Sequence, residues 1–225
     1  MEMYINIHTH RPGYGVNILD TCLGMPDEPA VGKVYLSAGI HPQFINGQEE
    51  ETLAHIRTLA ENGEIVAVGE CGMDRTAEAD LALQAALFEQ QTIIAAEYDL
   101  PVIIHGVRAV SELSAIAKRW GKDKKWIMHG FNYRREVLQD LLRHDIYISV
   151  GRHVMNDDSN VCRLLAEIPL DRMFLETDNS ACDIRDIYAK VAGRLDIPVE
   201  QLQQCVYDNF QRLFYKLKDT NIWNG

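Results

Sequence analysis

The amino-acid sequence predicts an α/β fold, a distorted TIM-like (β/α) barrel with seven or eight parallel strands. Short apolar, β-branched runs alternate with longer amphipathic stretches along the chain, and this order is typical of parallel β/α units. Runs such as Pro101-Val-Ile-Ile are apolar throughout, as expected for strands that are buried on both faces. Because no internal repeat, low-complexity tract or linker interrupts the pattern, we expect residues 1–225 to form a single domain.

Seven strands follow from the apolar runs. They span Met3 to His8, Lys33 to Ile40, Glu64 to Glu70, Pro101 to His105, Trp126 to Gly130, Asp145 to Val150 and Arg172 to Glu176. Gly15 to Thr21 is a candidate for an eighth strand. Residues 11–32 are rich in Gly and Pro and lack a helical stretch of ordinary length. The barrel is therefore predicted to be abbreviated between strands one and two.

Amphipathic stretches between the strands predict the helices. They cover residues 49–62, 79–98, 109–120, 134–143, 159–167, 184–194 and 199–217. An open doubly wound sheet is the alternative architecture, but such a sheet usually carries a glycine-rich phosphate loop after its first strand. The sequence has no such loop, so the barrel remains the prediction.

Charge and cysteine usage limit the class of protein. The net charge of −11 argues against a general nucleic-acid binder, which normally carries a basic stripe for phosphate contacts. A phosphodiester substrate would need bound metal ions and a few local arginines to supply a positive field. The five cysteines are scattered and never form CxxC, which argues against a disulfide framework and a zinc ribbon and fits a reducing cytosol.

The sequence also lacks the marks of export or membrane insertion. The first residues show no secretory signal, and no apolar run approaches the roughly 20 residues of a membrane span. We therefore expect a cytoplasmic protein without a membrane segment, and no obligate protein partner is evident.

Imidazoles and carboxylates lie at the ends of six of the seven predicted strands. In a β/α barrel the carboxyl ends of the strands form the mouth, where active sites are built. The residues are His8 and His10, His41, Glu70, His105, His129, and Glu176 with Asp178. His8 and His10 are two residues apart, so both rings can face one metal.

Each of these residues has an ordinary alternative explanation. A histidine at a strand end is often a satisfied core residue, Asp178 could cap the next helix, and Glu70 could form a buried salt bridge. Six such coincidences at one end of a barrel are improbable together, so the joint pattern predicts a metal site. Because the set contains His, Asp and Glu without thiolates, it suits zinc, manganese or magnesium.

The motifs that carry these residues resemble the TatD family of metal-dependent deoxyribonucleases, which belongs to the amidohydrolase-like barrels. The motifs, in order, are His8-Thr-His10, Gly39-Ile-His41-Pro42, Gly69-Glu70-Cys-Gly72-Met-Asp74, Pro101-Val-Ile-Ile-His105, His129-Gly-Phe131 and Glu176-Thr177-Asp178. The resemblance runs from residue 8 to about residue 178. It is specific as a set, although no single motif is specific alone.

The resemblance implies two divalent metal ions (Zn, Mn, Mg or Ni) and hydrolysis of a phosphodiester by metal-activated water. The first ion would be held by His8, His10, Glu70 and Asp178, and the second by Glu70, His105 and His129. Asp178 would orient or deprotonate the water. His41 and Glu176 would act on the phosphate or the leaving group, and Arg108 is our candidate for a further phosphate contact.

Three departures from the family pattern concern residues beside the proposed ligands. Asn6 stands where the family usually has Asp, Arg11-Pro12 follow the first motif, and Asn179 follows the last. The proposed metal ligands are retained, whereas the loops that would face a substrate differ. We expect DNA as the partner, as single strands or strand ends in preference to duplex.

Two alternatives remain beside the nuclease. The first is a related barrel hydrolase that acts on another ester or on an amide of a small molecule. Such enzymes often bridge their metals with a modified lysine, and the predicted strand ends carry none. The second is a non-catalytic binding protein that has kept the barrel, which the intact ligand set disfavours.

Overall fold

Eight parallel strands form one sheet, and each strand pairs with the next along the chain. The computed structural model describes residues 3–22, 24, 32–122 and 124–217. The strands are β1 (Ile5–Thr9), β2 (Val16–Asp20), β3 (Lys33–Ala38), β4 (Ala67–Asp74), β5 (Val102–Val107), β6 (Trp126–Met128), β7 (Tyr147–Val150) and β8 (Met173–Leu175). The predicted parallel barrel is confirmed, and the candidate eighth strand forms β2.

The carboxyl ends of β1 and β8 bring the two edges of the sheet together. The backbone N–H of His10 donates to the carbonyl of Asp178 at 3.2 Å, and the N–H of Asp178 donates to the carbonyl of His8 at 3.1 Å. Thr9 and Asp178 also form an isolated parallel bridge. These contacts nearly close the barrel and place its first and last predicted ligand segments side by side.

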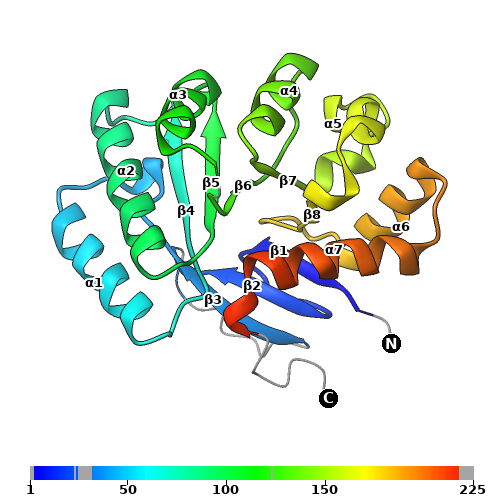
Figure 1. The fold of residues 1–225 in the computed structure, drawn as a ribbon, viewed down its shortest axis with the longest axis horizontal. Coiled ribbons are helices and arrows are strands. Elements are labelled where there is room, and N and C mark those ends of the chain that lie inside the picture. Colours follow the sequence, from blue (N-terminus) through cyan, green and yellow to red (C-terminus); the bar gives the residue numbers. More distant parts are fainter. Residues whose placement is uncertain (1–2, 23, 25–31, 123, 218–225) are drawn as a thin grey trace.

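The helices lie around the outside of the strands (Figure 1). They are α1 (Glu49–Glu61), α2 (Leu81–Glu97), α3 (Val110–Trp120), α4 (Arg135–Arg143), α5 (Asn160–Leu164), α6 (Ile184–Leu195) and α7 (Val199–Leu213). Short 3-10 turns are η1 (Pro42–Phe44), η2 (Arg152–Met155), η3 (Leu165–Glu167), η4 (Leu170–Arg172) and η5 (Tyr215–Leu217). Apolar side chains of the strands and of the facing helices share one hydrophobic core, which fixes the strand ends that carry the site.

Two predicted helices are shorter in the structure. The stretch 159–167 divides into α5 and η3, and the stretch 199–217 ends as a helix at Leu213 before η5. Both endings are tighter turns, which are common where a helix stops. The prediction of a single domain over residues 1–225 extends beyond the described residues and stays a prediction.

Residues 11–32, which were predicted to lack an ordinary helix, contain β2, and their described part (11–22, 24 and 32) forms no helix. The connection between β1 and β2 is itself short. Only residues 10–15 return the chain from the end of β1 to the start of β2, whereas a parallel connection usually needs a dozen residues or more. The buried Asn17 side chain holds the return segment, because its Oδ1 accepts from the N–H of Gly13 at 3.1 Å and its Nδ2 donates to the Gly13 carbonyl at 3.0 Å. Gly15 passes so close to Tyr4 that a Cβ would lie 2.3 Å from the Tyr4 carbonyl oxygen.

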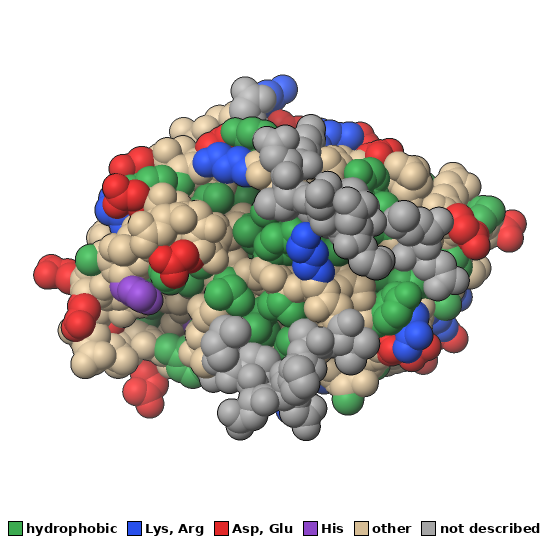
Figure 2. Space-filling view, turned by 90° about the horizontal axis from the view of Figure 1, so that it is seen from below, with side chains coloured by type: hydrophobic (Ala, Val, Ile, Leu, Met, Phe, Trp, Pro, Cys, Tyr) green, Lys and Arg blue, Asp and Glu red, His purple; other side chains and the backbone are tan. Residues whose placement is uncertain are grey.

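The next connection, between β2 and β3, lies partly outside the described residues, which exclude 23 and 25–31. Its described residues, 21, 22, 24 and 32, form no helix. Figure 2 views the molecule from below, and on this face hydrophobic side chains gather near the centre while acidic side chains lie toward the edge. In the described part of the chain, no helix has the length and hydrophobicity of a membrane span; the cellular location stays a prediction.

Candidate metal centre

Glu70 lies at the centre of the predicted ligands, but its position in the strand differs from the prediction. We expected a strand from Glu64 that ends at Glu70, whereas β4 begins at Ala67 and continues to Asp74. The strand continues because residues 71–74 pair with β5 beyond a register shift. Gly72 permits this close pairing, since a Cβ there would lie 1.9 Å from the His105 carbonyl oxygen.

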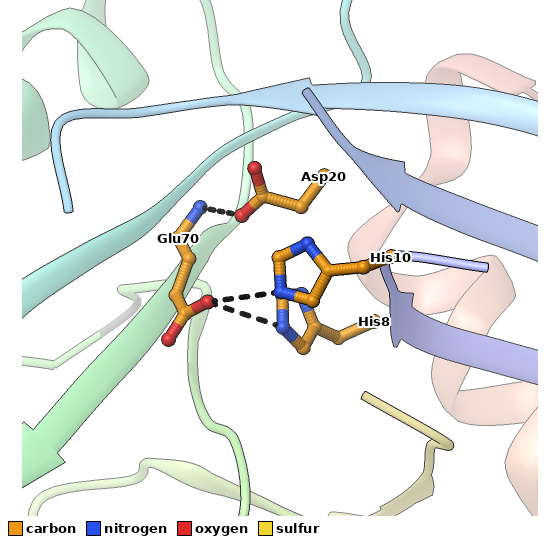
Figure 3. Close-up of side chains that lie close together, drawn as sticks. All are labelled: His8, His10, Asp20 and Glu70. Carbon is orange, nitrogen blue, oxygen red and sulfur yellow. Dashed lines mark hydrogen bonds and ion pairs between the residues drawn. The ribbon is translucent and has the colours of Figure 1, made fainter. Parts of the chain in front are cut away.

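One oxygen of Glu70 faces the two histidines of the first motif (Figure 3). The Oε2 atom of Glu70 lies 3.3 Å from Nε2 of His8 and 3.6 Å from Nε2 of His10. On the other side, Oδ1 of Asp178 lies 3.6 Å from both of these nitrogens. Two imidazoles and two carboxylates therefore converge on one small volume.

The other oxygen of Glu70 faces a second group of histidines. Its Oε1 atom lies 2.5 Å from Nδ1 of His105, 2.8 Å from Nε2 of His129 and 3.4 Å from Nε2 of His41. All three rings come from segments at the carboxyl ends of β3, β5 and β6. Glu70 thus spans both groups of predicted ligands, with one oxygen toward each.

Burial and mutual charge shift the protonation of these residues. Burial opposes ionisation of Glu70, but the charge on His129 and hydrogen bonds from His10, His105 and His129 hold its pKa well below the usual range. Burial and the charge on His129 oppose protonation of His8, yet hydrogen bonds to Asp178 and Glu70 raise its pKa to about 10.

The pKa values of Asp178 and His129 are also shifted by burial and by neighbouring charges. Burial favours the neutral form of Asp178, but the hydrogen bond and charge of His8 lower its pKa to about 2. Burial also opposes protonation of His129, while the charges of Glu70 and Glu176 raise its pKa well above the usual range. Without a metal, His8 and His129 are therefore protonated beside the ionised carboxylates of Glu70 and Asp178.

The donor atoms fit divalent metal ions. Two buried nitrogens, Nδ1 of His8 and Nδ1 of His10, form no hydrogen bond with any described residue. Leaving a buried polar group without a hydrogen bond costs about 1–3 kcal/mol. Nε2 of His8 points toward the carboxylates of Glu70 and Asp178, so one cation could bind all three groups. Nitrogen and oxygen donors without thiolates match zinc, manganese or magnesium. The residues therefore form candidate metal-binding clusters.

Asp20 is a site residue that the sequence analysis missed. It is buried at the end of β2, and its Oδ2 accepts from the backbone N–H of Glu70 at 2.7 Å. Ligand atoms of His8, His10, Asp20 and Glu70 all lie within 4.8 Å of one another (Figure 3). The available signal was an aspartate at the end of the candidate strand 15–21.

Asp74 is a second site residue that was not predicted, although it is the last residue of the motif Gly69–Asp74. It is buried, and its Oδ2 lies 3.3 Å from Nε2 of His105 and accepts from Nε2 of Gln43 at 2.8 Å. The opposite nitrogen of His105 faces Glu70. A carboxylate behind a ligand histidine fixes the ring and increases its basicity, so Asp74 positions His105.

The remaining predicted residues lie at different distances from this centre. Nε2 of His41 reaches the cluster, while its Nδ1 accepts from the N–H of Gln43 at 3.1 Å. Glu176 is fully buried behind His129, where its Oε1 accepts from the N–H of Gly130 at 2.6 Å and lies 3.5 Å from His129 Nδ1. Arg108 is exposed just past β5, and its guanidinium forms no hydrogen bond or ion pair with a described residue.

A recess of about 120 Å³ opens beside the cluster at the ends of β6 and β7. Its lining includes His105, His129, Asp178, Tyr133, Arg152 and His153. Arg152 and His153 were not predicted as site residues, because neither lies at the end of a predicted strand. Both occupy η2, directly after β7, so the seventh strand also directs side chains to the mouth.

Comparison with known proteins adds independent findings. Residues 16–215 match the family model described as "TatD related DNase". The "3'-5' ssDNA/RNA exonuclease TatD" of Enterobacter lignolyticus is 34% identical over 171 residues, which cover 74% of this chain and 65% of that protein. The protein of the same name from Erwinia tasmaniensis is 33% identical to this chain, over 72% of this chain and 64% of its own length. This chain thus spans slightly less than two thirds of these two relatives.

Solved structures support the fold. A TatD homologue from Escherichia coli K12 superposes with a TM-score of 0.73 at 24% identity, over 81% of this chain and 77% of that one. A TatD family hydrolase from Entamoeba histolytica gives a TM-score of 0.76 at 18% identity, over 95% of this chain and 98% of that one. At these identities the likeness concerns the barrel itself.

Proposed function

This chain belongs to the family of TatD-related DNases, and we propose that it is a metal-dependent hydrolase that cleaves phosphodiester bonds in DNA. One observation carries the proposal: Glu70 spans two groups of histidines at the mouth of the barrel, with one oxygen toward each group. A carboxylate in this position can be shared by two ions.

We propose two ion positions. His8, His10, Glu70 and Asp178 would hold one divalent ion, and Glu70, His105 and His129 would hold a second. Asp20 supports the first group through its hydrogen bond to the N–H of Glu70. When bound, such ions lower the pKa of a coordinated water and neutralise charge on the phosphate.

Asp178 is our candidate for the group that orients the attacking water and accepts its proton. Its side chain is one-third exposed, in contrast to Glu70, and it lines the recess beside the cluster. Its lowered pKa keeps the carboxylate ionised at neutral pH. An ionised carboxylate with solvent access can take up a proton as the water attacks.

His41 and Glu176 take different roles in this proposal. Nδ1 of His41 accepts a hydrogen bond from Gln43, so a neutral ring carries its proton on Nε2, toward the cluster. From there it can donate to a phosphate oxygen or to the leaving oxygen. Glu176 is buried behind His129, so we assign it to positioning that ring. Arg108 remains our candidate for an exposed phosphate contact.

We propose single-stranded DNA or strand ends as the substrate. The names of the relatives support this proposal, as does the net charge of −11, since an acidic surface disfavours long contacts with duplex. The test is an assay of protein reconstituted with manganese, magnesium or zinc against single-stranded DNA, duplex DNA, RNA, phosphate monoesters and simple amides. We expect release of nucleotides from single-stranded DNA. Absence of phosphodiester cleavage with every metal would refute the proposal, and cleavage of amides alone would favour the related-hydrolase alternative.

A further inference from the structure

The arginines of this acidic protein divide into two groups by their partners. Across the described residues, nine arginines form an ion pair with a carboxylate, and Arg212 donates to Tyr147. The guanidinium groups of the remaining four form no hydrogen bond, ion pair or ring contact with any described residue, although the backbone of three of them does form hydrogen bonds. They are Arg11, Arg108, Arg134 and Arg152, and all four are exposed.

These four residues, which we call the rim arginines, lie in segments that follow strands. Arg11 follows β1, Arg108 follows β5, Arg134 precedes α4 after β6, and Arg152 follows β7. In a parallel barrel the segments that leave the strands surround the mouth. The arginines without partners therefore gather at the end of the molecule that carries the metal centre.

Three carboxylates near the same mouth are paired with cations. Asp157 and Asp158, which follow η2, pair with Lys190 and with Arg163. Asp183, at the start of α6, pairs with Arg185. Because these pairs neutralise acidic groups while the rim arginines have no counter-charge, the mouth can attract an anion despite the net charge of −11.

The recess links the rim to the metal centre. Arg152 lines it together with His105, His129 and Asp178, three of the candidate ligands. Tyr133 lines the same recess and is half-buried, so an aromatic side chain and a guanidinium line one recess. A phosphate backbone with bases at its side matches this combination of guanidinium and aromatic groups.

We propose that the rim arginines bind the phosphates of a single nucleic-acid strand on both sides of the cleaved bond. The inference rests on the proposed function and adds the surface that holds the strand. The affinity would come from several separate arginines around the mouth.

The test measures how salt weakens binding of a strand. The probe is a fluorescent phosphorothioate oligothymidine, which resists cleavage, and the protein is metal-loaded. Three rim arginines are replaced together, as Arg108→Gln, Arg134→Gln and Arg152→Gln; Arg11 is kept because it adjoins His10. The matched control carries Arg57→Gln, Arg119→Gln and Arg143→Gln, three arginines of helices with carboxylate partners.

The two variants have the same net charge, so only position distinguishes them. Each phosphate neutralised on a single strand contributes about −0.7 to the slope of log K against log salt. We expect the slope of the rim variant to be less steep by about 2. Between about 50 and about 200 mM salt, its affinity should therefore fall about 18-fold less than that of the unmodified protein. The control is expected to keep the slope of the unmodified protein. Equal slopes in the two variants would overturn the inference.

Two further measurements keep the result interpretable. If the triple rim variant does not fold, Arg152→Gln alone should lose about 0.7 from the slope, and an unchanged slope would count against the inference. Arg152→Lys should keep the slope of the unmodified protein, because lysine has the same positive charge as arginine. Turnover of bis(p-nitrophenyl) phosphate by the unmodified protein is measured in parallel. Its absence with every metal would refute the proposed function, whereas turnover with equal slopes would refute the rim alone.

Discussion

Replacement of Glu70 by glutamine should remove both ion positions at once, because this side chain is the element they share. Its two oxygens lie between 2.5 and 3.6 Å from nitrogens of the two histidine groups, so an ion in either group would lie within about 4 Å of the carboxylate. Opposite unit charges at that distance attract by about 4 kcal/mol near a protein surface. The loss corresponds to about a thousandfold weaker binding at each position.

Isothermal titration with zinc or manganese, in competition with a chelator, measures this effect. Glu70→Gln should lose two equivalents of tightly bound metal, whereas Asp178→Asn should lose only the first and His105→Asn only the second. Glu61→Gln removes an exposed carboxylate of α1 and serves as the control. If Glu70→Gln bound as much metal as this control with similar affinity, the shared role of Glu70 would be refuted.

Three further predictions concern protons, positioning and stability. Because the metal-free pKa of His8 is about 10, this ring is protonated at pH 7 and must lose its proton to bind metal. The affinity for metal should therefore rise with pH, up to tenfold per pH unit for each proton released. Calorimetric titrations in buffers of different ionisation enthalpy should detect the released proton. Asp74→Asn should weaken metal binding at the His105 position about 10- to 100-fold, measured by the same competition, with an unchanged affinity contradicting the positioning role. Tyr188→Phe should lower the free energy of unfolding by about 1–3 kcal/mol, because the buried hydroxyl accepts from the N–H of Ile5 and donates to its carbonyl; urea denaturation checks this, and an unchanged midpoint would contradict it.

Much of the fold and of the candidate site could be predicted because the relevant signals are local. Apolar runs identify buried strands, and parallel strands place their carboxyl ends at one mouth. Residues such as His8, His105 and His129 follow directly from that rule, and the structure brings them together around Glu70. The expectation that residues 11–32 lack an ordinary helix depended on composition alone, and it holds for the described residues of that segment.

The features that were missed depend on contacts between distant segments. The end of β4 could not be placed, because its second half is defined by pairing with β5. Asp20 lies on β2, a strand of five residues whose short sequence pattern only suggested a strand. The role of Asp20 depends on its hydrogen bond from the N–H of Glu70, a residue far away in the sequence. Likewise, sequence does not reveal which arginines lack a carboxylate partner, because several of the ion pairs, such as Arg57–Glu97 and Arg135–Glu167, join different elements of the fold.

The most direct test of the metal centre is a crystal structure of the protein grown with manganese or zinc, with anomalous diffraction recorded at the absorption edge of the metal. We predict two anomalous peaks that flank Glu70. One should lie among Oε2 of Glu70, His8, His10 and Asp178, and the other among Oε1 of Glu70, His105 and His129. Metal that binds elsewhere, with no anomalous peak beside Glu70, would contradict the account.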